Sequence, residues 1–180
     1  MRRLILLRHA KTERDSPTGR DFDRRLDERG HRDAREMGKY IADSRLSPDL
    51  ALVSPAVRAR ETWLLAAPHL KSADLAFEPD LYGAEVSELL RVISAAAGRA
   101  SDPKVGTLLV VAHNPGLHEL GLALIGDSGI AERRELEGNL PTSGIVVIDF
   151  AVEDWADIAL RAGTLERFVS PRKLRLQREA

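Results

Sequence analysis

The stretch that decides the fold lies at the start of the chain and reads Arg2-Arg3-Leu4-Ile5-Leu6-Leu7-Arg8-His9. A short apolar run bounded by charged residues is typical of a strand that is buried on both faces of a sheet. The run therefore predicts a strand over residues 2–7, with Arg8 and His9 at its carboxyl end. Four apolar residues are too few for the hydrophobic region of a signal peptide, so we expect a cytoplasmic protein.

The rest of the chain alternates strand-like runs with helix-like segments. Further strands are expected over residues 49–53, 75–78, 107–112 and 144–150, with residues 157–160 as a candidate partner of the last one. Helices are expected over residues 28–44, 55–67, 86–97 and 114–125, a long loop over residues 11–27, and a loop or loose end from residue 170. This alternation predicts an α/β fold, a three-layer α/β/α sandwich with a mostly parallel central sheet.

Two of the expected helices share a start signal. Ser54-Pro55 and Asn114-Pro115 each combine a preferred helix N-cap with proline, a preferred first helical residue. Each pair directly follows an expected strand, so both helices should begin at the carboxyl edge of the sheet.

Composition narrows the possible classes of function. The 180 residues carry 27 Lys and Arg, 28 Asp and Glu, a formal net charge of −1 and no cysteine. The length favours a single domain over residues 1–180. The charge balance argues against nucleic acid or a membrane surface as a partner, and no apolar run is long enough to span a bilayer. The lack of cysteine excludes a disulfide scaffold and a cysteine nucleophile. The oligomeric state is left open.

Polar side chains follow three of the expected strands at their carboxyl ends. Arg8-His9 follows the first strand, the segment 54–58 with Arg58 follows the second, and His113-Asn114 follows the strand over residues 107–112. In open α/β sheets, ligands bind beyond the carboxyl ends of the strands. If these strands are parallel neighbours, two histidines and two arginines meet at one place.

This set of residues favours a phosphate ligand. Arginine presents planar donors that match phosphate oxygens, and helix N-termini add free N–H groups. A neutral imidazole can act as a nucleophile toward phosphorus. A metal site built from His9, His113 and His118 is an alternative, but no carboxylate lies at typical ligand spacing. We therefore expect no metal and no other cofactor.

The same residues resemble the histidine phosphatase superfamily, also called phosphoglycerate mutase-like. Residues 6–10 resemble its Arg-His-Gly signature, residues 54–62 its Ser-x-x-x-Arg-Ala-x-x-Thr motif, and residues 111–114 its third motif. Residues 26–30 match the element that opens the first helix, with aspartate in place of threonine. The four motifs keep the order and spacing of the family from residue 2 to about residue 125.

Within the superfamily, the chain most resembles the small SixA-type phosphohistidine phosphatases. It has Arg-His-Ala in place of Arg-His-Gly, a compact length, and similar segments at residues 81–84, 113–117 and 141–144. The resemblance implies a phosphoglycerate mutase-like fold and a phosphatase that needs no metal. It implies that His9 is the nucleophile and becomes phosphorylated, and that Arg8, Arg58 and His113 complete the phosphate pocket. Asn114 is a further candidate for substrate binding.

One departure from the family bears on the substrate. Larger members place an acidic proton donor after the third strand, whereas residues 80–85 here carry no carboxylate at the family position and Glu85 is a nearby candidate. An alkyl phosphate needs that acid because an alkoxide leaves poorly. The imidazole of a phosphohistidine can instead be protonated on its other ring nitrogen and leave neutral.

The sequence therefore favours a phosphohistidine-bearing protein as the substrate. A small-molecule phosphomonoesterase and a mutase-like phosphotransferase are the alternatives among enzymes. A phosphate-binding module without turnover is the alternative outside them, and an intact set of Arg8, His9, Arg58 and His113 argues against it.

Overall fold

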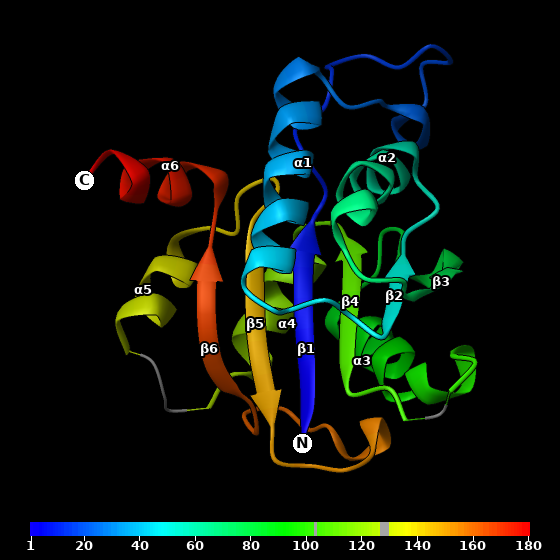
Figure 1. Ribbon diagram of the computed structural model, residues 1–180. Coiled ribbons are helices and arrows are strands. Elements are labelled where there is room, and N and C mark those ends of the chain that lie inside the picture. Colours follow the sequence, from blue (N-terminus) through cyan, green and yellow to red (C-terminus); the bar gives the residue numbers. More distant parts are fainter. Residues whose placement is uncertain (103, 127–129) are drawn as a thin grey trace.

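The computed structural model describes residues 1–102, 104–126 and 130–180. A six-stranded sheet has the order β3-β2-β4-β1-β5-β6 (Figure 1). Its strands are β1 (Arg2–Arg8), β2 (Leu50–Val53), β3 (Asp74–Phe77), β4 (Thr107–Ala112), β5 (Ile145–Phe150) and β6 (Thr164–Val169). The α-helices are α1 (Glu28–Asp43), α2 (Val57–Ala66), α3 (Val86–Ser94), α4 (Gly116–Leu124), α5 (Ile130–Gly138) and α6 (Pro171–Glu179).

The sheet is mixed and mostly parallel, as predicted. β1 pairs in parallel with β4, and β2 pairs in parallel with both β4 and β3. β5 runs antiparallel to its two neighbours, β1 and β6. In Figure 1, α1 and α2 lie on one side of the sheet and α3 and α4 on the other. The carboxyl ends of β1, β2 and β4 therefore meet at one edge, as the motif pattern requires.

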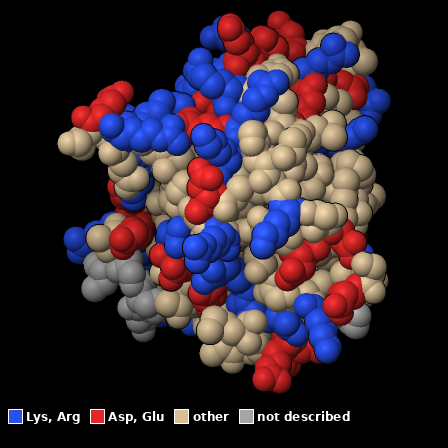
Figure 2. Space-filling model, viewed as in Figure 1, with Lys and Arg blue, Asp and Glu red and all other residues tan. Residues whose placement is uncertain are grey.

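The charges on the surface are of both signs. On the face seen in Figure 2, Lys and Arg are interspersed with Asp and Glu among the described residues, and tan areas lie between them. Within the described residues, we find no helix that has both the length and the apolar character to cross a bilayer.

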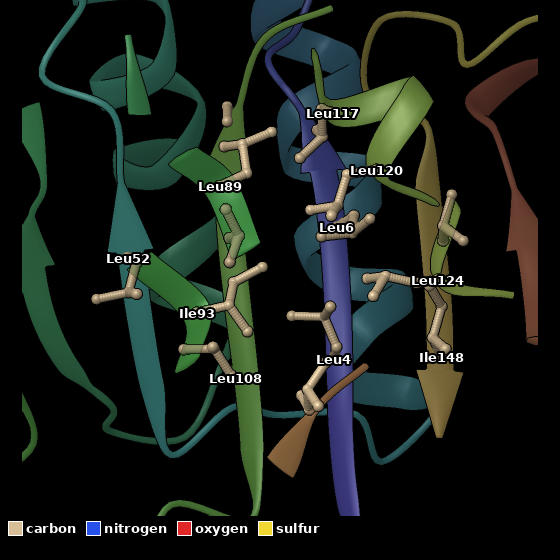
Figure 3. Close-up of a cluster of buried hydrophobic side chains, with 14 of the residues drawn as sticks. Leu4, Leu6, Leu52, Leu89, Ile93, Leu108, Leu117, Leu120, Leu124 and Ile148 are labelled. Atoms are coloured by element: carbon tan, nitrogen blue, oxygen red, sulfur yellow. The ribbon is translucent and has the colours of Figure 1, made fainter. Parts of the chain in front are cut away.

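The central strand β1 is buried on both faces, which explains its uninterrupted apolar run. Leu4 and Leu6 pack into the cluster beneath α3 and α4, where Figure 3 shows Leu6 near Leu117 and Leu120 and Leu4 farther down the strand. Ile5 and Leu7 point to the opposite face and join the cluster beneath α1 and α2. Successive strand residues alternate between faces, so one run of four supplies both cores.

The predicted partner strand of β5 was wrong. Residues 157–160 do not pair with β5; the pairing strand is β6, which begins four residues later. Trp155 explains the difference, because its fully buried ring donates a hydrogen bond from Nε1 to the Val105 carbonyl at 2.8 Å. This anchor holds the chain in a turn, with a 3-10 helix at Trp155–Asp157, before the strand starts.

The C-terminal tail is a helix, not the predicted loop or loose end. Ser170 caps α6 by accepting a hydrogen bond from the Lys173 N–H. Arg175 then binds Asp33 at 3.0 Å and Glu36 at 2.7 Å, and so fastens α6 to α1. The mostly charged helix α5 was not predicted at all, because its sequence has no apolar stripe.

The two cap-plus-proline signals were also misassigned. α2 begins at Val57 and α4 at Gly116, each later than predicted, and neither Ser54 nor Asn114 caps its helix. Both side chains are bound elsewhere, as described below. α3 ends at Ser94, earlier than predicted, and a separate 3-10 turn covers Ala96–Arg99.

The close approach of α1 and α2 depends on Gly38. A Cβ at this position would lie 2.5 Å from the Ala66 Cα and 2.6 Å from the Ala66 carbonyl oxygen. We expect Gly38→Ala to lower the free energy of unfolding by about 1–3 kcal/mol, measured in urea, because backbone atoms must move apart. Gly98→Ala is the control, since nothing lies within 4 Å of its Cβ position. Equal stability of the two variants would contradict the packing argument.

Candidate active site

His9 lies directly after β1, and its side chain is 6% exposed. Its Nδ1 lies 2.8 Å from the Ala10 carbonyl oxygen. A carbonyl can only accept, so Nδ1 must carry the proton, and the other ring nitrogen, Nε2, keeps a free lone pair. The backbone beside His9 thus selects the tautomer that leaves Nε2 as a nucleophile.

His113 follows β4 and lies next to His9 because β1 and β4 pair in register. The two ring centroids are 5.2 Å apart. His113 Nε2 lies 2.6 Å from Ser54 Oγ, and Ser54 Oγ accepts a weaker hydrogen bond from the Ala56 N–H at 3.4 Å. Among the described residues, His113 Nε2 is the acceptor within reach of the Ser54 hydroxyl proton, so we assign that proton to this hydrogen bond, which places the imidazole proton on Nδ1. Ser54 therefore serves the site and not the start of α2.

The two predicted arginines are held by oxygen atoms from other segments. Arg8 donates from Nη1 to the Leu140 carbonyl at 2.9 Å. Arg58, whose side chain is 6% exposed, donates to the carbonyl and the carboxylate of Asp21 at 2.8 and 3.0 Å. The positive charges of both arginines act on His9 and His113 and lower their pKa values. The four predicted groups are thus close together.

Three buried nitrogen atoms of this cluster have no hydrogen-bond partner among the described residues. They are Arg8 Nε, Arg58 Nε and His113 Nδ1. With the proton of His113 assigned to Nδ1, all three are donors. A buried donor without a partner is costly, so a cluster of them indicates a site for an acceptor such as phosphate.

Burial keeps both histidines neutral. Burial lowers the pKa of His9 to about 3. The hydrogen bond to the Ala10 carbonyl opposes this shift, and the charges of His113, Arg58 and Arg8 add to it. Burial and Arg58 likewise lower the pKa of His113 to about 4. The pKa of Arg8 is lowered by burial and by the charge of Arg58. At neutral pH the cluster therefore holds two cationic guanidinium groups and two neutral imidazoles.

Thr62 links the two halves of the cluster, although the sequence reasoning did not single it out. Its fully buried hydroxyl donates to the Arg58 carbonyl at 2.7 Å and accepts from the Ala10 N–H at 2.9 Å. The first turn of α2 is thereby fixed against the residue that follows His9.

The segment before β5 supplies a backbone acceptor that no sequence motif signals. The Leu140 carbonyl accepts from Arg8 Nη1 and also from Asn114 Nδ2, each at 2.9 Å. The N–H of Ser143 donates to the carbonyls of Arg8 and His9 at 3.1 and 3.2 Å. Asn114 is thus part of the cluster, but its amide binds Leu140 instead of capping α4.

Two further residues were missed because they lie in loops. Asp21 reaches Arg58 from the 3-10 turn Asp21–Asp23, inside the predicted long loop. Tyr82 donates from its hydroxyl to Asp21 Oδ2 at 2.9 Å, and its ring meets His113 edge-on with centroids 5.5 Å apart. Because Tyr82 and Asp21 lie in separate loops, no regular spacing in the sequence indicates that their side chains are in contact.

A cavity of about 740 Å³ adjoins the cluster at His113 and Asn114. Glu85 lines it from the start of α3, is exposed, and has its own N–H bound by Glu88 at 2.9 Å. Glu119, which the sequence reasoning did not consider, lines the same cavity from α4. The two carboxylates are therefore candidates for contact with the part of a substrate beyond its phosphate.

The structure does not bring His118 to the other two histidines. Its Nε2 lies 2.5 Å from the Leu136 carbonyl oxygen, on the side of α4 that faces α5. Across residues 1–102, 104–126 and 130–180, no three His, Asp or Glu side chains are grouped as metal ligands.

The depressed pKa of His9 predicts how stability depends on pH. From pH 6.5 down toward 3, the unfolded chain binds a proton at this residue that the folded chain does not, so stability falls as the pH falls below 6.5. Between neutral pH and pH 5, we expect His9 to lower the free energy of unfolding of the wild type by about 2 kcal/mol. The His9→Gln variant should lack this contribution. Urea unfolding at pH 7.5 and 5.0 measures it, with exposed His69→Gln as control. An equal pH effect in wild type and His9→Gln would contradict the assignment.

Comparison with known proteins identifies the family. Residues 4–88 match the model of the histidine phosphatase superfamily (branch 1). An uncharacterized protein of Mycobacterium tuberculosis is 36% identical over 171 residues, which cover 92% of this chain and 100% of the relative. The chain belongs to the histidine phosphatase superfamily, as the four motifs predicted.

Solved structures agree with this assignment. A protein of Agrobacterium tumefaciens, described as a candidate phosphohistidine phosphatase SixA, is 31% identical with a TM-score of 0.78, over 94% of this chain and 98% of that chain. A protein of Nakamurella multipartitia with the same description is 27% identical with a TM-score of 0.80, over 94% and 96% of the two chains. The predicted similarity to SixA proteins is confirmed.

Proposed function

We propose that this member of the histidine phosphatase superfamily is a metal-independent phosphatase that works through a covalent phosphohistidine at His9. The observation that carries the proposal is the tautomer of His9, whose Nδ1 donates to the Ala10 carbonyl and whose Nε2 is left with its lone pair beside two arginines. Its natural substrate, in this proposal, is a phosphohistidine borne on a protein.

In the first step, His9 Nε2 attacks phosphorus and the bond from phosphorus to the leaving group breaks. The electron pair of that bond goes to the leaving group. The His9 ring becomes a phosphorylated imidazolium, and its positive charge is stabilised by the hydrogen bond from Nδ1 to Ala10. No proton has to be removed from His9 beforehand, because its pKa of about 3 keeps the ring neutral.

The charge of the transferring phosphoryl group falls on three donors already in place. Arg8 Nε, Arg58 Nε and His113 Nδ1 are buried and have no partner among the described residues. Donors that are fixed before the reaction stabilise the transition state without further reorganisation. Each of these side chains is held through another of its nitrogen atoms: Arg8 by Leu140, Arg58 by Asp21 and His113 by Ser54.

In the second step, water attacks the phosphorus of the phosphoenzyme. The electron pair of the phosphorus–nitrogen bond returns to His9 Nε2, inorganic phosphate leaves, and the second proton of the water passes to solvent. His9 is then neutral again with its proton on Nδ1, ready for another cycle.

Two observations support a phosphohistidine substrate over an alkyl phosphate. Glu85 is exposed and lies at the start of α3, and it is not bound to Arg8, Arg58, His9 or His113 by any contact in the described structure. Two relatives with solved structures, 31% and 27% identical to this chain, are described as candidate phosphohistidine phosphatases. A substrate whose leaving group can carry its own proton needs no acid from the enzyme.

A turnover panel tests the proposal. We expect hydrolysis of p-nitrophenyl phosphate and of a phosphohistidine peptide in the presence of a chelator, and much slower hydrolysis of a phosphoserine peptide and of sugar phosphates. Preference for the sugar phosphates would favour the small-molecule phosphomonoesterase, and phosphate transfer to a second substrate would favour the mutase-like enzyme. No turnover of any of them would indicate a binding module.

Glu85→Gln tests whether an enzyme acid takes part. We expect this variant to change phosphohistidine turnover less than tenfold, because the proton of the substrate ring does the work. Glu119→Gln is the matched control on the other wall of the cavity. A hundredfold loss on the phosphohistidine peptide in folded Glu85→Gln, with Glu119→Gln unaffected, would instead identify Glu85 as a proton donor.

A further inference from the structure

One carboxylate at the cluster has so far only the role of holding Arg58 in place. Asp21 accepts hydrogen bonds from Arg58 Nη1 at its carbonyl (2.8 Å) and from Arg58 Nη2 at Oδ2 (3.0 Å). The same Oδ2 accepts from the Tyr82 hydroxyl at 2.9 Å. Arg24 donates from Nε to the other carboxylate oxygen, Oδ1, at 3.0 Å. Asp21 is therefore held in place by three partners, one of which, Arg58, is a phosphate-binding residue of the proposed mechanism.

Asp21 lies on the solvent side of Arg58. The side chain of Arg58 is 6% exposed, whereas that of Asp21 is 56% exposed. His9, at 6% exposure, attacks from the buried floor of the site. In an in-line displacement the leaving group departs on the side opposite the nucleophile, so we infer that it leaves toward solvent, the side on which Asp21 is exposed.

Asp21 carries a negative charge at neutral pH. Burial opposes its ionisation, but the hydrogen bond from Tyr82 and the charge of Arg58 outweigh burial and lower the pKa of this carboxyl. Its charge also reaches His113, where it opposes the lowering of the histidine pKa. The same charge therefore also acts on a group that leaves from the pocket that His113 lines.

We propose that Asp21 is a specificity-determining residue that selects a substrate whose leaving group is protonated and cationic while it is still bonded to phosphorus, such as the ring of a phosphohistidine. The inference rests on the proposed function and names the feature of the leaving group that the same site recognises. An anionic leaving group gains nothing from Asp21 and is repelled by it.

The role of Asp21 is to keep a proton on the substrate. As His9 Nε2 bonds to phosphorus, the phosphorus–nitrogen bond of the substrate breaks and its electron pair returns to the substrate ring. That ring leaves as neutral imidazole because its other nitrogen is already protonated. A nearby carboxylate favours this protonated form and can accept its hydrogen bond, so the fraction of substrate ready to react rises.

Asp21→Asn tests this role because the amide keeps one oxygen that can accept from Arg58 and Tyr82 and loses the charge. It also puts an NH2 group in place of the oxygen that accepts from Arg24. We expect kcat/KM for a phosphohistidine peptide to fall at least tenfold. Any loss caused by disturbing Arg58 falls on p-nitrophenyl phosphate as well, so its kcat/KM should fall at least tenfold less than that of the peptide, because its leaving group is an anion. Asp23→Asn is the matched control, since Asp23 lies in the same turn but binds Thr18 instead of Arg58.

The two substrates make the outcomes distinct. An equal fall on both would show that Asp21 only positions Arg58, and no change on either would show that its charge has no role; each result overturns the inference and leaves the proposed phosphatase intact. Wild type that hydrolyses p-nitrophenyl phosphate but not the peptide would also overturn it. Failure of the proposed function would be seen separately, because the wild type would then show neither turnover nor a phosphoenzyme. That result would overturn both the proposed function and the inference about Asp21.

Discussion

The His9→Ala variant is expected to lose turnover by at least about 10⁴-fold, because it removes the atom that forms the covalent bond. Wild type mixed with a labelled substrate and quenched should yield a phosphoenzyme that is labile in acid and stable in base, the behaviour of a phosphorylated imidazole. The variant should yield none. The cause lies in the geometry at the end of β1, where the Ala10 carbonyl holds Nδ1 and leaves Nε2 free.

The control for this experiment is His69→Ala. His69 is an exposed histidine in the 3-10 turn Ala67–His69, away from the end of β1, and its loss should leave both turnover and labelling unchanged. Label that persists in His9→Ala, or that resists acid in wild type, would mean that another residue is the nucleophile. The free energy of unfolding of His9→Ala should be measured as well, so that lost turnover is not confused with lost fold.

Much of the fold could be predicted because hydrophobic pattern and sheet topology agree. The run over residues 4–7 has to be buried on two faces, and only a central strand covered by helices on both sides provides that. The three strands that carry the motifs turned out to be adjacent, in the order β2-β4-β1. Adjacent parallel strands bring their carboxyl ends together, so Arg8, His9 and His113 could be placed from sequence.

The two misplaced helix starts share a cause, which is competition for a polar side chain. Ser54-Pro55 and Ser170-Pro171 are the same dipeptide, yet Ser170 caps its helix and Ser54 does not. The difference is that His113 lies within 2.6 Å of the Ser54 hydroxyl, whereas the Ser170 hydroxyl binds the N–H of Lys173. A local signal cannot include a partner that arrives from a strand 59 residues away.

The parts of the site that sequence missed are those fixed by tertiary contact alone. Leu140 contributes its backbone carbonyl, which every residue type has, so its identity contains no signal. Asp21 and Tyr82 meet through loops that are far apart in the chain. Thr62 stood within a recognised motif, but its role became visible only once its hydroxyl was seen to join Ala10 to Arg58.

Arg58 and Arg60 form a matched pair for testing the phosphate pocket. They are two residues apart in α2, carry the same charge, and face different surroundings. Arg58 is buried against Asp21 in the site, whereas Arg60 is exposed and stacks on the Phe77 ring with 5.3 Å from its guanidinium carbon to the ring centroid. A variant at either position removes one positive charge, so a general effect of net charge cancels in the comparison.

We expect Arg58→Ala to lower kcat/KM for p-nitrophenyl phosphate by about 10²–10³-fold, and Arg60→Ala to change it less than threefold. Removing one fixed donor to a transition-state oxyanion costs about this much in other enzymes. The loss at Arg58 also removes one of the two cations paired with the Asp21 carboxylate, so that less of its negative charge beside the phosphate is offset. Arg58→Lys should recover only part of the activity, because the ammonium group of lysine lacks the several coplanar N–H donors with which a guanidinium group can bind Asp21 and phosphate at once. If Arg60→Ala is the inactive variant and Arg58→Ala is not, the register of the second motif is wrong, and with it the composition of the phosphate pocket.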